Sequence, residues 1–217
     1  MVMRRLKLAA TGLMAILLVG TPAIASDNWT LGKDEDGIRV YSRVPETVNQ
    51  TAREIRAVVE VDATPEALLS LVLDYPAAPE WRQSIKEMTM YERIDDTNWF
   101  IRVVTDLPWP LSDREMVIKV ELQRDAETGT IIYAFHGAGE FAETEEQRQE
   151  IESLVGYFQF TPKENGRTEA TYQSVFASPL PVPGWVIDRM IYSFPYNQMS
   201  EMRNRSSDKK YSQASIP

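Results

Sequence analysis

The chain has 217 residues, and its 32 acidic against 23 basic side chains give a formal net charge of −9. It contains no cysteine and one histidine, which excludes disulfides, a thiol nucleophile and thiolate metal ligands. Negative charge repels nucleic acid and anionic bilayers at long range. We therefore expect no nucleic-acid partner and no stable electrostatic attachment to a membrane.

The first 25 residues predict a secretory signal peptide. Arg4, Arg5 and Lys7 precede an apolar run over residues 8–19, and a small-residue pattern follows, with cleavage expected after Ala25. A membrane anchor is the alternative, but a spanning helix needs about 20 apolar residues, and this run is shorter. Cleavage would remove three basic residues and no acid, changing the charge from −9 to about −12. The expected product is a soluble periplasmic or secreted chain.

Two strands and a helix are predicted next. Residues 38–43 and 51–61 alternate apolar with polar side chains, the period of a half-buried strand. A helix is predicted to begin at Pro65, because Thr64 is a suitable N-cap and proline fits the first helical position. Asp74 ends this helix, and the residues after it can form one further turn.

Six more strands are predicted beyond this helix, separated by turn-like stretches such as IDDTN, DAETG and KENG. The clearest alternation is in the third, where Met116, Ile118 and Val120 share one face, so one side of the sheet must meet an apolar interior. The six ranges are 85–94, 99–106, 112–124, 130–137, 151–161 and 168–177.

A long helix is predicted from Trp185 to about Arg205, with a kink at Pro195 because proline lacks an amide donor. The polar residues after it are expected to be frayed. This order of elements indicates an α+β fold, with helices against one face of a curved antiparallel sheet.

Several motifs occur in a definite order: DGIRVYSR, LDYPAAPEW, LPWPLSDREMVIKV, GYFQFTP and PLPVPGWVIDRMIYSFPYNQMSEMRN. Together they resemble the START (StAR-related lipid transfer) domain family, bacterial exported type, of the helix-grip superfamily. The resemblance implies a curved sheet of about eight strands wrapped around a long C-terminal helix. It also implies one lipid-binding domain over residues 26–206. The residues after it, 207–217, are predicted from their composition to be a polar tail.

The resemblance further implies a cavity that binds, and can transfer, a lipid or other hydrophobic ligand. Some sterol-binding relatives carry a buried basic residue six positions after the motif arginine. This chain has Val120 six positions after Arg114, which disfavours a sterol-specific site. We expect a monomer that makes transient membrane contact and needs no metal and no cofactor.

The candidate ligand-binding residues are mainly apolar side chains of the strands and the last helix. Close packing as an ordinary core is the alternative for each of them. Trp109, between two prolines, is expected either in a lid or packed into the rim. Arg114 is expected either in an ion pair that fixes this loop or against a ligand headgroup. The set is Ile101, Val103, Trp109, Arg114, Met116, Ile118, Val120, Tyr133, Phe135, Phe158, Tyr172, Met190 and Phe194.

The sequence contains no catalytic constellation, so we expect no enzyme. The alternative is an enzyme resembling the polyketide cyclases and aromatases that share the helix-grip fold. That chemistry needs polar groups inside the cavity, for which the candidates are Arg102, Tyr133, His136, Tyr172 and Arg189. A domain with a filled core that acts through its surface is a third possibility.

Overall fold

A computed structural model describes residues 28–45, 52–106, 109, 113–144, 147, 151–176 and 184–213. The expected signal peptide lies outside these ranges, as do most of the loop around Trp109 and the last four residues. Among the described residues, no helix is long and apolar enough to cross a membrane.

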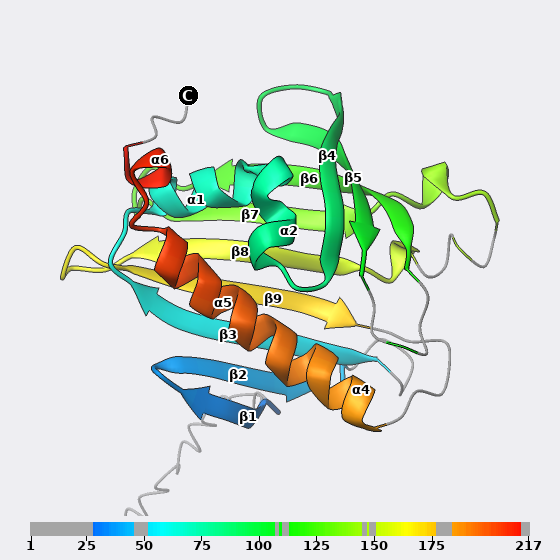
Figure 1. Cartoon of the computed structure of the whole chain (residues 1–217). Helices are drawn as coiled ribbons and strands as arrows, with labels where there is room; N and C mark the ends of the chain where they lie inside the picture. The colour runs from blue at the N-terminus through cyan, green and yellow to red at the C-terminus, as the bar shows by residue number, and fades with distance from the viewer. Residues whose placement is uncertain are drawn as a thin grey trace, which may run out of the picture.

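Nine antiparallel strands form one sheet, in the order β1-β2-β3-β9-β8-β7-β6-β5-β4 (Figure 1). The order places β3 beside β9, so strands from the two ends of the chain pair with each other. The strands are β1 (Thr30–Glu35), β2 (Ile38–Arg43), β3 (Arg53–Val61), β4 (Ile85–Arg93), β5 (Asn98–Thr105), β6 (Glu115–Arg124), β7 (Ile131–Gly137), β8 (Val155–Pro162) and β9 (Thr168–Phe176).

Eight of these strands correspond to predicted ones, and alternation explains why. In β3 every second residue from Ile55 to Val61 is buried, because successive side chains of a strand point to opposite faces. The first strand was not predicted: its residues are almost all exposed, so it carries no apolar period. The predicted start of β8 at Ile151 is wrong, because residues 151–152 are helical and the strand begins at Val155.

Both outer strands of the sheet are irregular. The register of β1 against β2 shifts between Leu31 and Lys33, and that of β4 against β5 shifts twice, at 85–87 and 90–92. Each shift marks a bulge, which bends and twists the strand that carries it.

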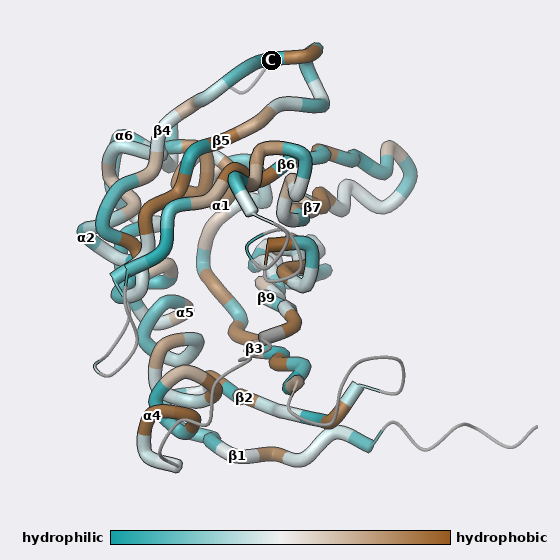
Figure 2. Tube along the Cα trace, turned by 90° about the vertical axis from the view of Figure 1, so that its right-hand side faces the viewer, coloured by the Kyte–Doolittle hydropathy of each residue, from teal (hydrophilic) through white to brown (hydrophobic). Residues whose placement is uncertain are grey.

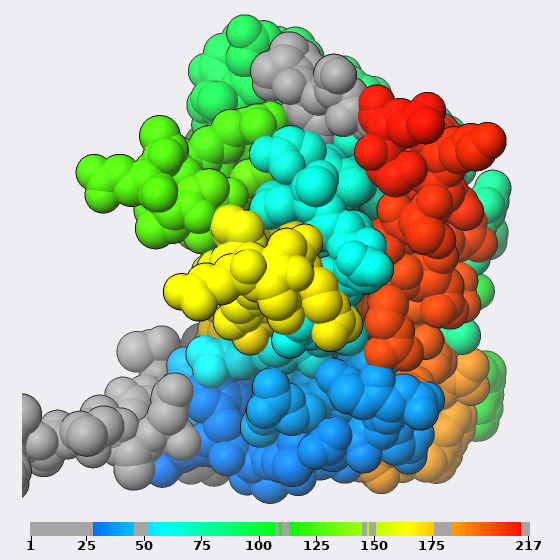
Figure 3. Space-filling model, turned by 90° about the vertical axis from the view of Figure 1, so that its left-hand side faces the viewer, coloured from blue at the N-terminus to red at the C-terminus, as the bar shows by residue number. Residues whose placement is uncertain are grey.

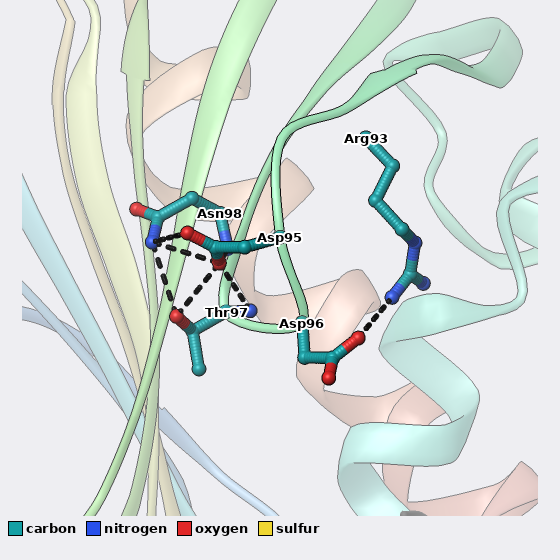
Figure 4. Close-up of polar contacts among 5 residues, drawn as sticks. All are labelled: Arg93, Asp95, Asp96, Thr97 and Asn98. Atoms are coloured by element: carbon teal, nitrogen blue, oxygen red, sulfur yellow. Dashed lines mark hydrogen bonds and ion pairs between the residues drawn. The ribbon is translucent and has the colours of Figure 1, made fainter.

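The turn between β4 and β5 is organised by one carboxylate (Figure 4). Asp95 Oδ1 accepts hydrogen bonds from the backbone N–H groups of Thr97 and Asn98, both at 2.7 Å. Arg93 and Asp96 form an ion pair at 3.4 Å on the same turn. Hydrogen bonds, first from the Thr97 backbone, lower the pKa of Asp95, because they stabilise its charged form.

The helix α1 (Pro65–Leu73) begins and ends where the sequence predicts. The Thr64 hydroxyl accepts a hydrogen bond from the Ala67 backbone N–H at 3.2 Å, and Asp74 is the C-cap. The further turn is also present, as a 3₁₀ turn η1 (Tyr75–Ala77) followed by α2 (Ala78–Trp81). These short helices bring Trp81 and Arg82 into the interior.

The predicted long helix is present as three consecutive segments: α4 (Gly184–Asp188), the π-helical turn η3 (Arg189–Ser193) and α5 (Phe194–Arg205). Pro195 lies in the first turn of α5, so the wider π turn falls on the residues that a proline ring would crowd. Near Pro195, where a kink is expected, the helix widens locally, and the chain remains helical through this turn.

The expectation of a frayed C-terminal segment is wrong for residues 206–213. They include a short helix, α6 (Lys209–Ser212), and the Tyr211 side chain is only 5% exposed. Tyr211 donates a hydrogen bond of 2.8 Å to Asp74, and Lys210 pairs with the same carboxylate. Burial raises the pKa of Asp74, but these bonds outweigh it and hold the pKa below its ordinary value. A pattern of polar residues did not reveal this docking.

All the main helices cover one face of the sheet. Figure 2 shows the sheet curving from β1 and β2 at the bottom to β4 and β5 at the top, with α4 and α5 across its open side. In the space-filling view the C-terminal segment, in orange to red, runs along one side of the molecule from the blue N-terminal strands (Figure 3). The sheet and helices thus enclose a common interior.

Candidate functional site

A cavity of about 240 Å³ lies in this interior, under the C-terminal helix. Its wall combines the inner faces of β3 to β9 with side chains from η3 and α5 and with Arg82, the residue directly after α2. The cavity is partly open to solvent, and it is larger than the voids usually found in close-packed protein interiors. The filled-core alternative requires side chains to fill the space beneath the helix. The cavity shows that they do not fill it.

Most of the predicted ligand-binding residues line this cavity. Alternation in the strands places them there, since one face of each strand points at the helix. Aromatic rings are prominent among them: Phe158 and Tyr172 have ring centroids 4.9 Å apart. The predicted residues that line it are Ile101, Val103, Arg114, Met116, Ile118, Tyr133, Phe135, Phe158, Tyr172, Met190 and Phe194.

Two predicted residues do not line the cavity. Val120 points to the interior and is fully buried, but it packs in the core beside Trp99, opposite it on β5. Trp109 is 79% exposed, so its ring is not packed into a rim. Most of its loop lies outside the described residues.

The wall also contains residues that the sequence patterns did not indicate. Several lie at strand ends, between elements or on α5, where strand alternation no longer indicates direction. Arg82 is the most unexpected, because a charged residue directly after a helical turn is ordinarily exposed. The additional wall residues are Ile55, Arg82, Ser84, Ile85, Met88, Thr105, Ser153, Leu154, Ser174, Val175, Pro195 and Gln198.

A buried polar chain borders the cavity at Tyr133. The indole N–H of Trp99 donates to the Tyr75 hydroxyl at 2.7 Å, and the hydroxyls of Tyr75 and Tyr133 are hydrogen-bonded at 3.2 Å. Burial raises the pKa of Tyr75, and that of Tyr133 well above its ordinary value. Burial also raises the pKa of Tyr172. All three phenols are neutral at physiological pH, and those of Tyr133 and Tyr172, which line the cavity, can donate hydrogen bonds to a bound molecule.

Arg82 is held at the end of α2, where its backbone N–H bonds the Ala78 carbonyl at 2.9 Å. Only 7% of the residue is exposed. The guanidinium lies over the rings of Trp81 and Phe158, at 4.5 and 5.2 Å from their centroids. Burial lowers the pKa of Arg82, because it disfavours the charged form.

The acids beside Arg114 are paired with other residues. Asp113 forms an ion pair with Lys86 at 2.8 Å, and Glu115 forms one with Arg102 at 2.6 Å. Arg114 itself is fixed by backbone bonds across to Thr105 and lines the cavity.

Three of the candidate catalytic residues are not in the wall. Arg102 lies on the opposite face of β5, paired with Glu87 and Glu115. His136 follows the wall residue Phe135, so it points to the other face of β7, and Arg189 is exposed. The remaining two, Tyr133 and Tyr172, do line the cavity.

Solved structures share this architecture. A STAR-related lipid transfer protein from Xanthomonas axonopodis has a TM-score of 0.67 and 22% identity, covering 83% of this chain and 99% of that one. Human StAR-related lipid transfer protein 5 has a TM-score of 0.63 and 17% identity, covering 87% and 88%. At these identities the similarity establishes the fold, which is the helix-grip fold of START domains.

Sequence comparison extends the relationship. An uncharacterised protein of Pseudomonas aeruginosa is 27% identical over 190 residues, which cover 88% of this chain and 92% of that protein. The family model described as "Polyketide cyclase / dehydrase and lipid transport" matches residues 52–194, a span that includes α1, α2 and seven of the nine strands. The chain therefore belongs to the polyketide cyclase/dehydrase and lipid transport family.

Proposed function

We propose that the protein binds a lipid or other hydrophobic molecule in the cavity between the sheet and the C-terminal helix. The observation that carries this proposal is the cavity of about 240 Å³, whose wall is mainly apolar. Similarity to proteins described as lipid transfer proteins supports it.

The size of the cavity sets what it can enclose without rearrangement. It equals about eight water volumes at about 30 Å³ each, which is less than the roughly 300–1,000 Å³ of pockets for drug-sized ligands. If each of these eight volumes holds one methylene of a ligand, burial of the eight contributes about 6 kcal/mol gross, at about 0.8 kcal/mol each. The fit is therefore best for one short chain, or for part of a larger lipid after the helix moves.

The cellular setting is part of the same proposal. On the basis of the predicted signal peptide, we propose that the protein acts in the periplasm or outside the cell, as a monomer that takes its ligand from a membrane. The exposed Trp109 supports transient membrane contact, since tryptophan is suited to an apolar–water boundary. Cell fractionation of the full chain, with a copy lacking residues 1–25 as control, tests the location. Retention of both in the cytoplasm would refute export.

Extraction of the purified protein followed by mass spectrometry tests binding, with delipidated protein as the reference. We expect a recurrent apolar molecule, and uptake of a medium-chain lipid by the delipidated protein. A protein that is always empty and takes up no lipid would refute the proposal.

Adjacent positions of β6 provide a matched pair of variants. Met116 lines the cavity, whereas Val117 points to the other face, opposite Arg102. A Met116→Trp variant should fill the cavity and lose uptake, while Val117→Trp should keep it. Equal uptake by the two folded variants would place the ligand elsewhere.

A second candidate function is a cyclase- or dehydratase-type enzyme. It is favoured by one observation: the neutral phenols of Tyr133 and Tyr172 both face the cavity and can donate hydrogen bonds to a carbonyl oxygen. Incubation with a poly-β-carbonyl thioester, followed by mass spectrometry, tests it. Loss of water from this substrate that depends on both tyrosines would favour the enzyme over the binding protein.

A further inference from the structure

The buried guanidinium of Arg82 has few partners of its own. Its Nη1 donates to the sulfur of Met88 at 3.8 Å, and sulfur is a weak acceptor. The Nε and Nη2 atoms have no hydrogen-bond partner among the described residues, although both are buried. Buried polar groups are almost always hydrogen-bonded, so this arginine is an exception that needs an explanation.

The groups around Arg82 supply no negative charge. Among the described residues that line the cavity, the charged ones are Arg82 and Arg114, and both are positive. The ionisable groups that act on the guanidinium are three phenols, those of Tyr133, Tyr172 and Tyr75. Phenols are neutral at physiological pH, and burial raises the pKa values of these three further. Within the part of the chain that the structure describes, Arg82 is therefore a buried cation without a counter-charge.

A second unmet donor lies in the same wall. The Nε2 atom of Gln198, on α5, is buried and has no partner among the described residues. Helices α2 and α5 pack against each other, so Arg82 and Gln198 come from neighbouring elements. The unmet groups of both side chains are N–H donors, so the molecule that satisfies them must offer acceptors.

We propose that Arg82 is the anchor for an oxyanion headgroup, so that the natural ligand is an acidic amphiphile with a carboxylate or phosphate at one end and an apolar chain at the other. The inference rests on the proposed binding function and specifies its ligand class. The planar guanidinium carries N–H donors in a fork that matches either group. The aromatic and aliphatic wall takes the chain.

The overall charge of the protein works against this preference. With a formal net charge of −9, its long-range field repels anions. Stronger binding of an acid than of its neutral analogue must therefore come from a local group. A contact with a buried charge is also screened little by salt, so the preference should persist in about 0.5 M NaCl, where the Debye length is about 4 Å.

Calorimetric titration of the delipidated full chain tests the inference, with decanoate, methyl decanoate, decyl phosphate, acetate and inorganic phosphate as probes. We expect at least one of the two chain-bearing anions to bind about 10- to 100-fold more tightly than the ester, the value of a hydrogen bond to a charged group. Comparison of decanoate with decyl phosphate identifies the headgroup. Acetate and inorganic phosphate, which lack the chain, should bind weakly.

Two variants locate the effect. Arg82→Met should bind the ester as the native protein does but lose the preference for the anion. The control Arg102→Met, on the opposite face of the sheet, should keep it. Equal affinity of the native protein for ester and anions, or a preference that survives in Arg82→Met, would overturn this inference and leave hydrophobic binding intact. Failure of ester and anions alike to bind the native protein would overturn the proposed function itself.

Discussion

Replacing Arg82 with methionine should make the ligand-free protein more stable. Arg82 is buried, and two of its nitrogens have no partner among the described residues. An unmet buried donor costs about 1–3 kcal/mol, and more when the group is charged. Methionine has a similar length, carries no charge and can keep contact with the rings of Trp81 and Phe158.

The loss of two cation–π contacts offsets part of this gain, at about 0.5–2 kcal/mol each. We therefore expect the unfolding free energy of R82M to exceed that of the native protein by about 1–3 kcal/mol. At about 2–4 °C per kcal/mol for a chain of this size, the Tm should rise by roughly 2–12 °C.

Thermal and urea unfolding of delipidated protein measure this difference. The control R102M removes an arginine that is paired with two glutamates, so it should not raise the Tm. A bound acid should narrow the gap, because ligand at about 100 times its Kd stabilises the native protein by about 2.7 kcal/mol. A Tm of R82M well below that of the native protein would refute the reasoning, because it would show that the guanidinium is satisfied within the fold.

Three further predictions concern other parts of the molecule. Y75F should lower the unfolding free energy by about 1–3 kcal/mol, because the Tyr75 hydroxyl bonds both the Trp99 indole and the Tyr133 hydroxyl. Y133F should lower it by only about 0.5–1.5 kcal/mol, because the Tyr133 hydroxyl takes part in one of these two bonds. Equal urea midpoints for the two variants would contradict this prediction. D74N should have a lower unfolding free energy than the native protein above about pH 4. This difference should shrink as pH falls, because a carboxylate with a lowered pKa loses its stabilising contribution on protonation. Urea titrations at several pH values measure the difference, and a difference independent of pH would contradict the prediction. W109A should slow lipid uptake from vesicles without changing the equilibrium affinity, and an unchanged rate in stopped-flow fluorescence would exclude a role in membrane contact.

The sheet was predictable because one face of it meets the interior. In β6 the alternation through Met116 and Ile118 fixes which side chains point inward, and the structure places both in the cavity wall. The same logic predicted most of the wall from β5, β7, β8 and β9. It failed for β1, where almost every residue is exposed and no period exists.

Arg82 could not be predicted because no pattern surrounds it. It is one residue after a four-residue helix, and its direction depends on how α2 packs against β4 and α5. The docking of Tyr211 was missed for a similar reason, since its partner Asp74 is 137 positions away in the chain. Alternation reports which face a side chain takes, whereas these contacts depend on how separate elements come together.

The bulges in β1 and β4 bear on how the protein behaves at high concentration. An open sheet has two free borders, and regular borders act as templates onto which a second chain can add a strand, the first step of many aggregates. Here each border changes register at least once, so an incoming backbone cannot keep its hydrogen bonds in phase along the whole strand. Both borders of the sheet are thus poorly suited to pairing with a further strand.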